Sequence, residues 1–404
     1  MLGNLEPISV DSVTFIILAG GLALLVRFHA ERFFLGALVT AGTFLTLSWL
    51  GWRDLIALIL FLPIPYLTAR MLWGRRDLNA GVLLILAVVG QILLFLIIKR
   101  YTWFDFLGWV DHPVSVVGVS YILFRQLHLI VDSRFFGELP FTPLRYIGYI
   151  LSPWTLIAGP IQRYDAFCAG MDKVAFPERE ELLAASHRII NGFLLAFVAA
   201  PLFLNPSRIS NLAHPDANWV DVLVIFYGFP LYLYFNFAGY TSIMIGAARL
   251  CGFSTLPENF NHPYLASNSR DFWNRWHISF GVWIKTYVFT PVCTWLMKVS
   301  APRYHWLVML VAVLIAFYFV GVWHGTTINY LIFGILQGFG VIVSALFEQM
   351  RKRALGAKRS REFNNFFWFR AISIFITLHF TCFTFLLLND HPDRLIESMV
   401  TFFS

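Results

Sequence analysis

Charged residues are scarce in this chain of 404 residues: Lys, Arg, Asp and Glu together make up 13%, whereas 58% of the residues are hydrophobic. A water-facing surface cannot conceal so much apolar side chain, so the composition excludes an ordinary soluble globular protein. We therefore predict an all-α integral membrane protein. The net charge of +7 is carried beside hydrophobic runs, so we expect membrane lipid as a partner and no nucleic acid.

Cysteine is also rare, and its four copies lie far apart, at Cys168, Cys251, Cys293 and Cys382. No Cys-x-x-Cys spacing and no ligand-like cluster occurs, so we predict neither a disulfide framework nor a metal site. The N-terminal segment has no basic region and no small-residue cleavage site. Residues 13–28 are therefore predicted to form a retained first span rather than a signal peptide.

Polar stretches long enough to build a separate soluble core are missing, as are internal repeats and low-complexity tracts. We therefore expect a single membrane-embedded domain over residues 1–404. The lack of a repeat disfavours transporter folds built from inverted halves. The densest basic cluster, residues 351–361, is expected to face the cytoplasm, whereas both acidic chain ends are expected to face outward.

Hydrophobic runs of membrane-spanning length recur along the chain. A hydrocarbon core about 30 Å thick requires roughly 20 apolar residues per helix, and we predict about 11 such helices. The clearest runs cover residues 13–28, 33–52, 55–72, 80–98, 189–204, 220–235, 307–322, 328–346 and 371–388. Less regular segments at 114–131, 146–161 and 280–296 predict half-spans or re-entrant pieces. The amphipathic stretch 176–188 predicts either a short helix in the interface plane or an ordinary connecting helix.

A histidine lies deep in apolar sequence. His324 follows the run 307–322 and precedes the mostly apolar stretch 328–346. An ionisable group at such a depth is costly, which favours a functional role over a structural histidine held between helices. A second histidine, His277, ends a polar and aromatic-rich segment, where it either takes part in chemistry or braces a cavity wall.

The segment 257–277 is too polar to span lipid and too aromatic to be a bare loop. We expect it to lie inside the protein and to line a cavity, as a membrane-embedded active site would. Within it, Asp271, Asn274 and Arg275 are candidates for binding the phosphate or pantetheine part of an acyl donor. An internal Asp–Arg pair that only locks the segment is the alternative.

Six short motifs occur in the order in which one family carries them, within about residues 115–340. They are Val-Gly-Val-Ser-Tyr at 117–121, Ala-Gly-Pro-Ile-Gln-Arg-Tyr at 158–164, Asn-Phe-Ala-Gly-Tyr at 236–240, Pro-Glu-Asn-Phe-Asn at 257–261, Asp-Phe-Trp-Asn-Arg-Trp-His at 271–277 and Trp-His-Gly at 323–325. Together they make the sequence similar to the membrane-bound O-acyltransferase (MBOAT) family, in particular its bacterial branch that acts on cell-envelope polymers.

The resemblance implies a bundle of membrane helices, with re-entrant and interfacial helices around a central funnel that holds the reaction centre. An acyl thioester, either acetyl-CoA or an acylated carrier protein, would enter from the cytoplasm, and no tightly bound cofactor is implied. The acceptor would be a hydroxyl of an extracytoplasmic polysaccharide or of a partner acyltransferase. The protein would be a multi-pass protein of the bacterial plasma (inner) membrane.

His324 matches the family's near-invariant histidine and His277 its second conserved polar position. A neutral imidazole, with a pKa near about 6.5, can take the proton of a hydroxyl that attacks a thioester, and burial favours the neutral form. The remaining candidates for contact with the donor or the cavity are Asn236, Trp276, Trp323 and Arg163. Bracing of two helices is the alternative for Asn236, and an interfacial anchor is the alternative for Arg163.

Two departures from the alginate-type pattern leave the acyl group open. Residues 285–291 lack the expected Pro-Leu-Gly-Gly segment, and the chain ends without that subgroup's extra spans. Both features resemble the shorter D-alanyl transfer proteins, yet the motif at 158–164 fits either subgroup, and we favour acetyl by a narrow margin. A transporter without chemistry and a scaffold for a secreted transferase are the alternatives from other functional classes.

Overall fold

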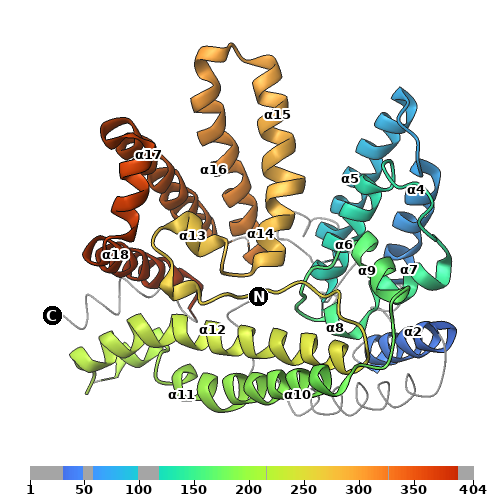
Figure 1. The fold of residues 1–404 in the computed structure, drawn as a ribbon, viewed down its shortest axis with the longest axis horizontal. Helices are drawn as coiled ribbons and strands as arrows, with labels where there is room; N and C mark the ends of the chain where they lie inside the picture. Colours follow the sequence, from blue (N-terminus) through green and yellow to red (C-terminus); the bar gives the residue numbers. More distant parts are fainter. Residues whose placement is uncertain (1–30, 49–57, 99–117, 215, 326, 390–404) are drawn as a thin grey trace. The chain divides into compact units, whose positions relative to one another are not determined.

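The computed structural model describes residues 31–48, 58–98, 118–214, 216–325 and 327–389. Every regular element within these ranges is a helix, as the composition predicted (Figure 1). The chain divides into two compact units. The first contains the described parts of Gly192–Tyr240 and Glu258–Ser404, and the second contains those of Ser9–Asn191 and Thr241–Pro257.

Within the described residues, six helical stretches are long and apolar enough to cross a membrane, judged by length and composition. They are Leu78–Ile98, Arg179–Leu212, Trp219–Leu250, Pro302–His324, Ile328–Asn364 and Phe367–Leu388. The predicted runs 80–98, 307–322 and 371–388 are thereby confirmed as long apolar helices. The predicted first span, residues 13–28, lies outside the described residues.

The second unit is built from short and medium helices. They are α2 (Glu31–Ser48), α4 (Pro63–Leu72), α5 (Leu78–Ile98), α6 (Val119–Asp132), α7 (Pro143–Ile150), α8 (Pro153–Leu156), α9 (Tyr164–Met171) and α10 (Arg179–Phe193). Buried amides join them: the Gln91 side chain donates to the Gln126 side chain at 2.7 Å, and Gln126 donates to the Phe61 carbonyl at 3.2 Å. Such pairing satisfies polar groups that lie away from water.

The first unit carries the longer helices. They are η2 (Leu194–Ala199), α11 (Ala200–Leu204), η3 (Ile209–Ala213), α12 (Trp219–Leu250, to Tyr240 in this unit), η4 (Pro263–Leu265), α13 (Ser269–Trp273), α14 (Ile278–Ile284), η5 (Lys285–Phe289), α15 (Thr290–Val299), η6 (Pro302–Tyr304), α16 (His305–His324), α17 (Ile328–Asn365), α18 (Phe367–Phe385) and η7 (Leu386–Leu388). Helices α15 and α16 lie side by side as a hairpin (Figure 1).

Several element boundaries differ from the sequence-based expectation. The stretch 176–188 is not a separate interfacial helix, because α10 starts at Arg179 and continues through the π-helical turn η2 into α11. The irregular segment 280–296 is likewise helical, but its α14 and α15 are separated by a second π-helical turn, η5. Hydropathy had predicted residues 220–235, which form only the N-terminal half of α12.

Helices α16 and α17 pack closely because glycine removes side-chain bulk at their crossing. A Cβ atom on Gly334 would lie 2.4 Å from the Phe317 carbonyl oxygen, and one on Gly321 would lie 2.5 Å from the Tyr330 carbonyl oxygen. Small residues allow this kind of close approach between membrane helices. The contact places the end of α16 beside the start of α17.

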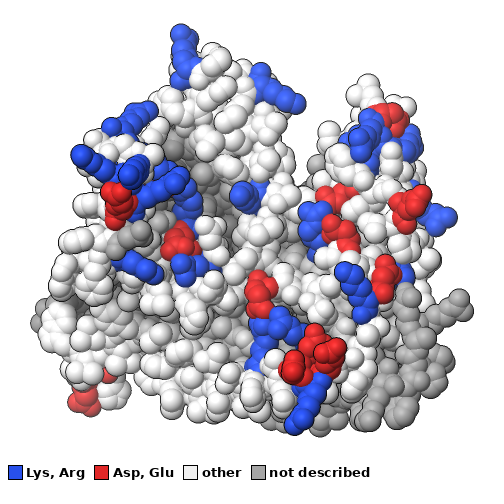
Figure 2. Space-filling model, viewed as in Figure 1, with Lys and Arg blue, Asp and Glu red and all other residues white. Residues whose placement is uncertain are grey.

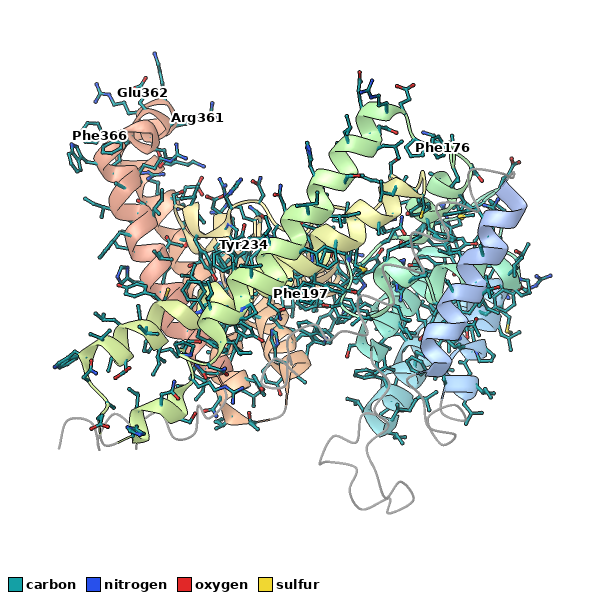
Figure 3. All side chains as sticks on the ribbon, turned by 90° about the horizontal axis from the view of Figure 1, so that it is seen from below. Phe176, Phe197, Tyr234, Arg361, Glu362 and Phe366 are labelled. Atoms are coloured by element: carbon teal, nitrogen blue, oxygen red, sulfur yellow. The ribbon has the colours of Figure 1, made fainter. Side chains whose placement is uncertain are left out.

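The opposite end of α17 is basic and bends at Gly356, which has φ 76° and ψ 159°. Glycine adopts this left-handed φ without the penalty that a Cβ atom brings. Arg351 reaches across the bend and donates to the Ser360 hydroxyl at 3.0 Å. Lys and Arg side chains gather over this end of α17 (Figure 2), and Arg361 and Phe366 lie there (Figure 3).

Candidate active site

The polar, aromatic-rich segment 257–277 folds back on itself in the first unit. The Asn261 amide donates to the Arg275 carbonyl at 2.9 Å, and the Ile278 amide donates to the Asn259 carbonyl at 2.9 Å. These bonds pair the two ends of the segment like neighbouring strands. They satisfy backbone groups that would otherwise be costly to bury.

His277 is the last residue of this segment and the N-cap residue of α14. Its φ of 44° and ψ of 54° lie in the left-handed region, which costs a residue with a Cβ atom roughly 1–2 kcal/mol. Backbone strain of this kind concentrates at functional sites. The residue is 3% exposed. Burial lowers the pKa of His277, which lies outside the six membrane-spanning stretches, to about 3, so its imidazole is neutral.

Aromatic rings enclose the His277 imidazole. Phe280 stacks on it with 5.0 Å between ring centroids, and Phe237 of α12 meets it edge-on at 4.8 Å. Trp323 of α16 lies 6.1 Å from His277 and 4.5 Å from Phe280. A wall of this composition excludes water and so strengthens electrostatic interactions within it. Figure 3 shows Tyr234, on α12, among the crowded side chains of this unit.

His324 is the last residue of α16 and is only partly buried. Its ring lies 4.5 Å from the Trp323 ring, 6.3 Å from Tyr330 and 5.6 Å from Phe333, the last two on α17. The indole of Trp323 thus touches both histidines that the sequence singled out. His277 is buried among aromatic rings, whereas His324 is partly exposed.

Asp271 and Arg275 form an ion pair within the segment, with Arg275 Nε 2.8 Å from Asp271 Oδ1. The other carboxylate oxygen accepts the Ser267 amide at 3.1 Å, and the Asn268 side chain caps α13 by accepting the Asp271 amide at 2.9 Å. Both carboxylate oxygens therefore have partners within the segment, and these charge-assisted contacts join α13 to the residues on either side of it.

The other candidate residues in this unit differ in their burial and in their contacts. Trp276 is buried and stacks on Phe272 at 5.7 Å, so it belongs to the aromatic core. Asn274 is exposed at the end of α13. Asn236 is buried on α12, and its Oδ1 has no hydrogen-bond partner among the described residues. A buried acceptor without a partner costs about 1–3 kcal/mol.

Arg163 lies in the second unit, apart in the chain from the two histidines. Its guanidinium pairs with Asp132 at 3.1 Å and with Asp165 at 3.2 Å, and its side chain is 44% exposed. Exposed ion pairs of this kind contribute little to the stability of a fold.

Two residues of the site escaped the sequence-based prediction. Asn259 lies in a quoted motif, but nothing in the sequence pairs it with His277, to which its side chain bonds. Gln337 accepts the Trp273 indole N–H at 3.0 Å and donates to the Thr384 hydroxyl at 2.7 Å, so it ties α13 to α17 and α18. A buried glutamine in an apolar helix was the signal available for it.

Comparison with known proteins agrees with the motifs. A model of the membrane-bound O-acyltransferase family matches residues 138–387, more than half of the chain, and both histidines lie within the match. The chain is 31% identical over 377 residues to the teichoic acid D-alanyltransferase of Bacillus subtilis, covering 91% of this chain and 92% of that protein. It is 30% identical to the Streptococcus thermophilus protein of the same name, over 69% of this chain and 70% of the other.

A second group of relatives covers less of the sequence. The chain is 26% identical over 240 residues to a probable alginate O-acetylase of Pseudomonas syringae pv. tomato, covering 58% of this chain but only 43% of that protein. The match therefore spans less than half the length of this relative. The chain belongs to the membrane-bound O-acyltransferase family and is a multi-pass membrane acyltransferase.

Proposed function

We propose that this protein moves a short acyl group from a thioester donor to a hydroxyl of an extracytoplasmic cell-envelope polysaccharide or of a relay protein. The observation that carries the proposal is the contact of both His277 and His324 with one indole, Trp323. His277 is buried and His324 is partly exposed, so a substrate that reaches His324 can transfer a proton to an imidazole at the edge of the buried site.

His324 acts as the general base in this proposal. Its unprotonated ring nitrogen accepts the proton of the acceptor hydroxyl while the hydroxyl oxygen attacks the carbonyl carbon of the thioester. The C–O bond forms, the C–S bond breaks, and the leaving thiolate takes up the proton that the imidazole received. His277 takes part in the same step as a second imidazole that holds the reacting groups.

D-alanyl is the acyl group we favour, with acetyl as the alternative. Relatives named as teichoic acid D-alanyltransferases match up to 91% of this chain and 92% of their own length, whereas the probable alginate O-acetylase of Pseudomonas syringae pv. tomato matches over 43% of its length. This difference reverses the narrow preference for acetyl drawn from the sequence. The donor is a carrier protein or CoA, used as a substrate and not held as a cofactor.

In this proposal the remaining candidate residues bind the acyl donor or support the residues that bind it. Asn236 offers a buried acceptor, and Trp323 contacts both imidazoles. The further residues that we assign to donor binding or to its support are Asp271, Asn274, Arg275, Trp276 and Arg163. We propose that the whole chain forms one membrane domain of about 11 spans around a funnel, in the bacterial plasma membrane.

The proposal is tested with purified protein in lipid vesicles and two labelled donors, a D-alanyl carrier thioester and acetyl-CoA. We expect transfer from one donor to a polymer hydroxyl, and a loss of about 100-fold or more in His324→Ala, because a general base contributes that much. The control is His214→Ala, at a side chain that is 70% exposed. Transfer by His324→Ala at more than a tenth of the wild-type rate, with wild-type thermal stability, would refute the assignment.

A further inference from the structure

The side-chain oxygen of Asn259 lies at the centre of a buried hydrogen-bond cluster. It accepts the Ser279 amide at 3.2 Å and the Ser279 hydroxyl at 2.8 Å, and it lies 3.0 Å from Nδ1 of His277. Asn259 is 1% exposed, and Ser279 is also buried. The three groups therefore interact where water does not compete.

The cluster determines which ring nitrogen of His277 carries the proton. A backbone N–H can only donate, so the Asn259 atom that faces the Ser279 amide must be the amide oxygen and not its NH2 group. That oxygen can only accept, so Nδ1 of the neutral His277 must carry the hydrogen. The other ring nitrogen, Nε2, is then unprotonated and can only accept.

We propose that Asn259 is a positioning residue that fixes this tautomer, so that His277 presents an unprotonated Nε2 to a substrate group that donates an O–H or N–H. The inference rests on the proposed function and adds to it the class of group that His277 meets. An acceptor hydroxyl and the ammonium of a D-alanyl group both satisfy this requirement.

A purely structural role for Asn259 is the competing explanation. His277 occupies the N-cap position of α14 but makes no side-chain cap bond. Asn259 takes over this function, because its oxygen accepts the amide of Ser279, the second residue of the helix. The cap and the tautomer lock use the same oxygen, so the test must separate them.

Asn259→Asp keeps an acceptor oxygen for the helix cap and for Nδ1 of His277, and it adds a negative charge beside the imidazole. A carboxylate oxygen still caps the helix, and a negative charge is favourable at a helix N-terminus, so the melting temperature should stay near that of the wild type. The new charge beside His277 favours imidazolium, so its pKa should rise. Among the described residues, the His324 side chain acts on the charge of His277, and this variant leaves His324 unchanged. The acid limb of the rate against pH should therefore move to higher pH.

Asn259→Leu removes both roles, and Asn261→Leu is the matched control. Asn261 lies in the same segment, but its side chain is exposed. We expect Asn259→Leu to lower kcat at least tenfold, which corresponds to about 1.4 kcal/mol in the barrier, and Asn261→Leu to leave it unchanged. An Asp variant with the wild-type pH profile and rate would show that Asn259 only caps the helix and would overturn the proposal.

A second readout does not depend on activity. Nitrogen-15 NMR of labelled protein, with the His277 signals assigned by difference from His277→Asn, reports which ring nitrogen carries the proton. We expect a protonated Nδ1 in the wild type and a mixture of tautomers in Asn259→Leu. A protonated Nε2 in the wild type would overturn the inference even if acyl transfer is observed. If neither donor is used, the proposed function fails, but the NMR result still decides the tautomer.

Discussion

The surroundings of His277 and those of His324 are held in place by different forces. His277 is fixed by the hydrogen bond that its Nδ1 donates to Asn259, on a segment that folds back on itself, and by a left-handed backbone. His324 ends a long helix and is placed by the close crossing of α16 and α17 and by ring contacts. One imidazole therefore depends on a few directional bonds, and the other depends on the spacing of two helices.

The helix crossing offers the largest expected effect. In Gly334→Leu the new side chain meets the Phe317 carbonyl oxygen, where even a Cβ atom would lie only 2.4 Å away. We expect α16 and α17 to separate, with a stability loss of about 3 kcal/mol and loss of acyl transfer, because His324 leaves its position. The control is Gly81→Ala on α5, where a Cβ atom meets nothing within 4 Å. A melting temperature of Gly334→Leu equal to that of the control would contradict this packing.

The second prediction separates the imidazole of His277 from its backbone. Asparagine tolerates left-handed φ values better than alanine, so His277→Asn removes the ring with little added strain, whereas His277→Ala adds about 1 kcal/mol. Both variants should lose about 100-fold in transfer rate, but Ala should unfold more readily. Rates and thermal melts of the two proteins check this. Equal melting temperatures would show that the left-handed backbone is not strained.

The third prediction concerns the Trp323 indole, which contacts both imidazoles. Trp323→Leu removes the contacts to His277, Phe280 and His324, and we expect about a tenfold loss in kcat because both imidazoles gain freedom. Trp323→Phe keeps an aromatic ring there and should recover most of the rate. If the Leu variant is as fast as the Phe variant, the indole does not organise the site.

The smallest effect is expected at the ion pair of the segment. Arg275→Lys retains the charge but loses the fork that meets Asp271, and the pair is partly exposed, so stability should fall by under about 1 kcal/mol. The donor KM should stay within about threefold if the pair only locks the segment. A tenfold rise in KM with unchanged kcat would instead indicate donor binding by Arg275.

The sequence predicted apolar length better than it predicted contacts. Residues 80–98 form a helix as expected. Only 17% of the most apolar 18 residues of α5 is buried inside the protein, so its apolar composition alone was enough to predict it. The most apolar 18-residue stretch of α12 is 50% buried. This helix also buries the polar residues Asn236 and Thr241, and hydropathy had cut it short at residue 235.

In the candidate site, too, the sequence predicted individual residues better than it predicted their contacts. His324 was singled out because an ionisable group in apolar sequence is rare, and His277 because it ends a polar, aromatic-rich segment. The structure places both against Trp323. The bond from Asn259 to His277 could not be predicted, because it depends on how the segment 257–277 folds back. Arg163 was grouped with the donor contacts from its motif, whereas in the structure it pairs with Asp132 and Asp165.

A double-mutant cycle on the two imidazoles tests the central claim most directly. Transfer rates are measured for wild type, His277→Asn, His324→Ala and the double variant, all reconstituted in the same vesicles. Residues that act as a unit in one chemical step are strongly non-additive, so the double variant should be about as slow as the slower single variant. Losses that multiply would show that the two histidines act independently and would contradict a shared proton-transfer site.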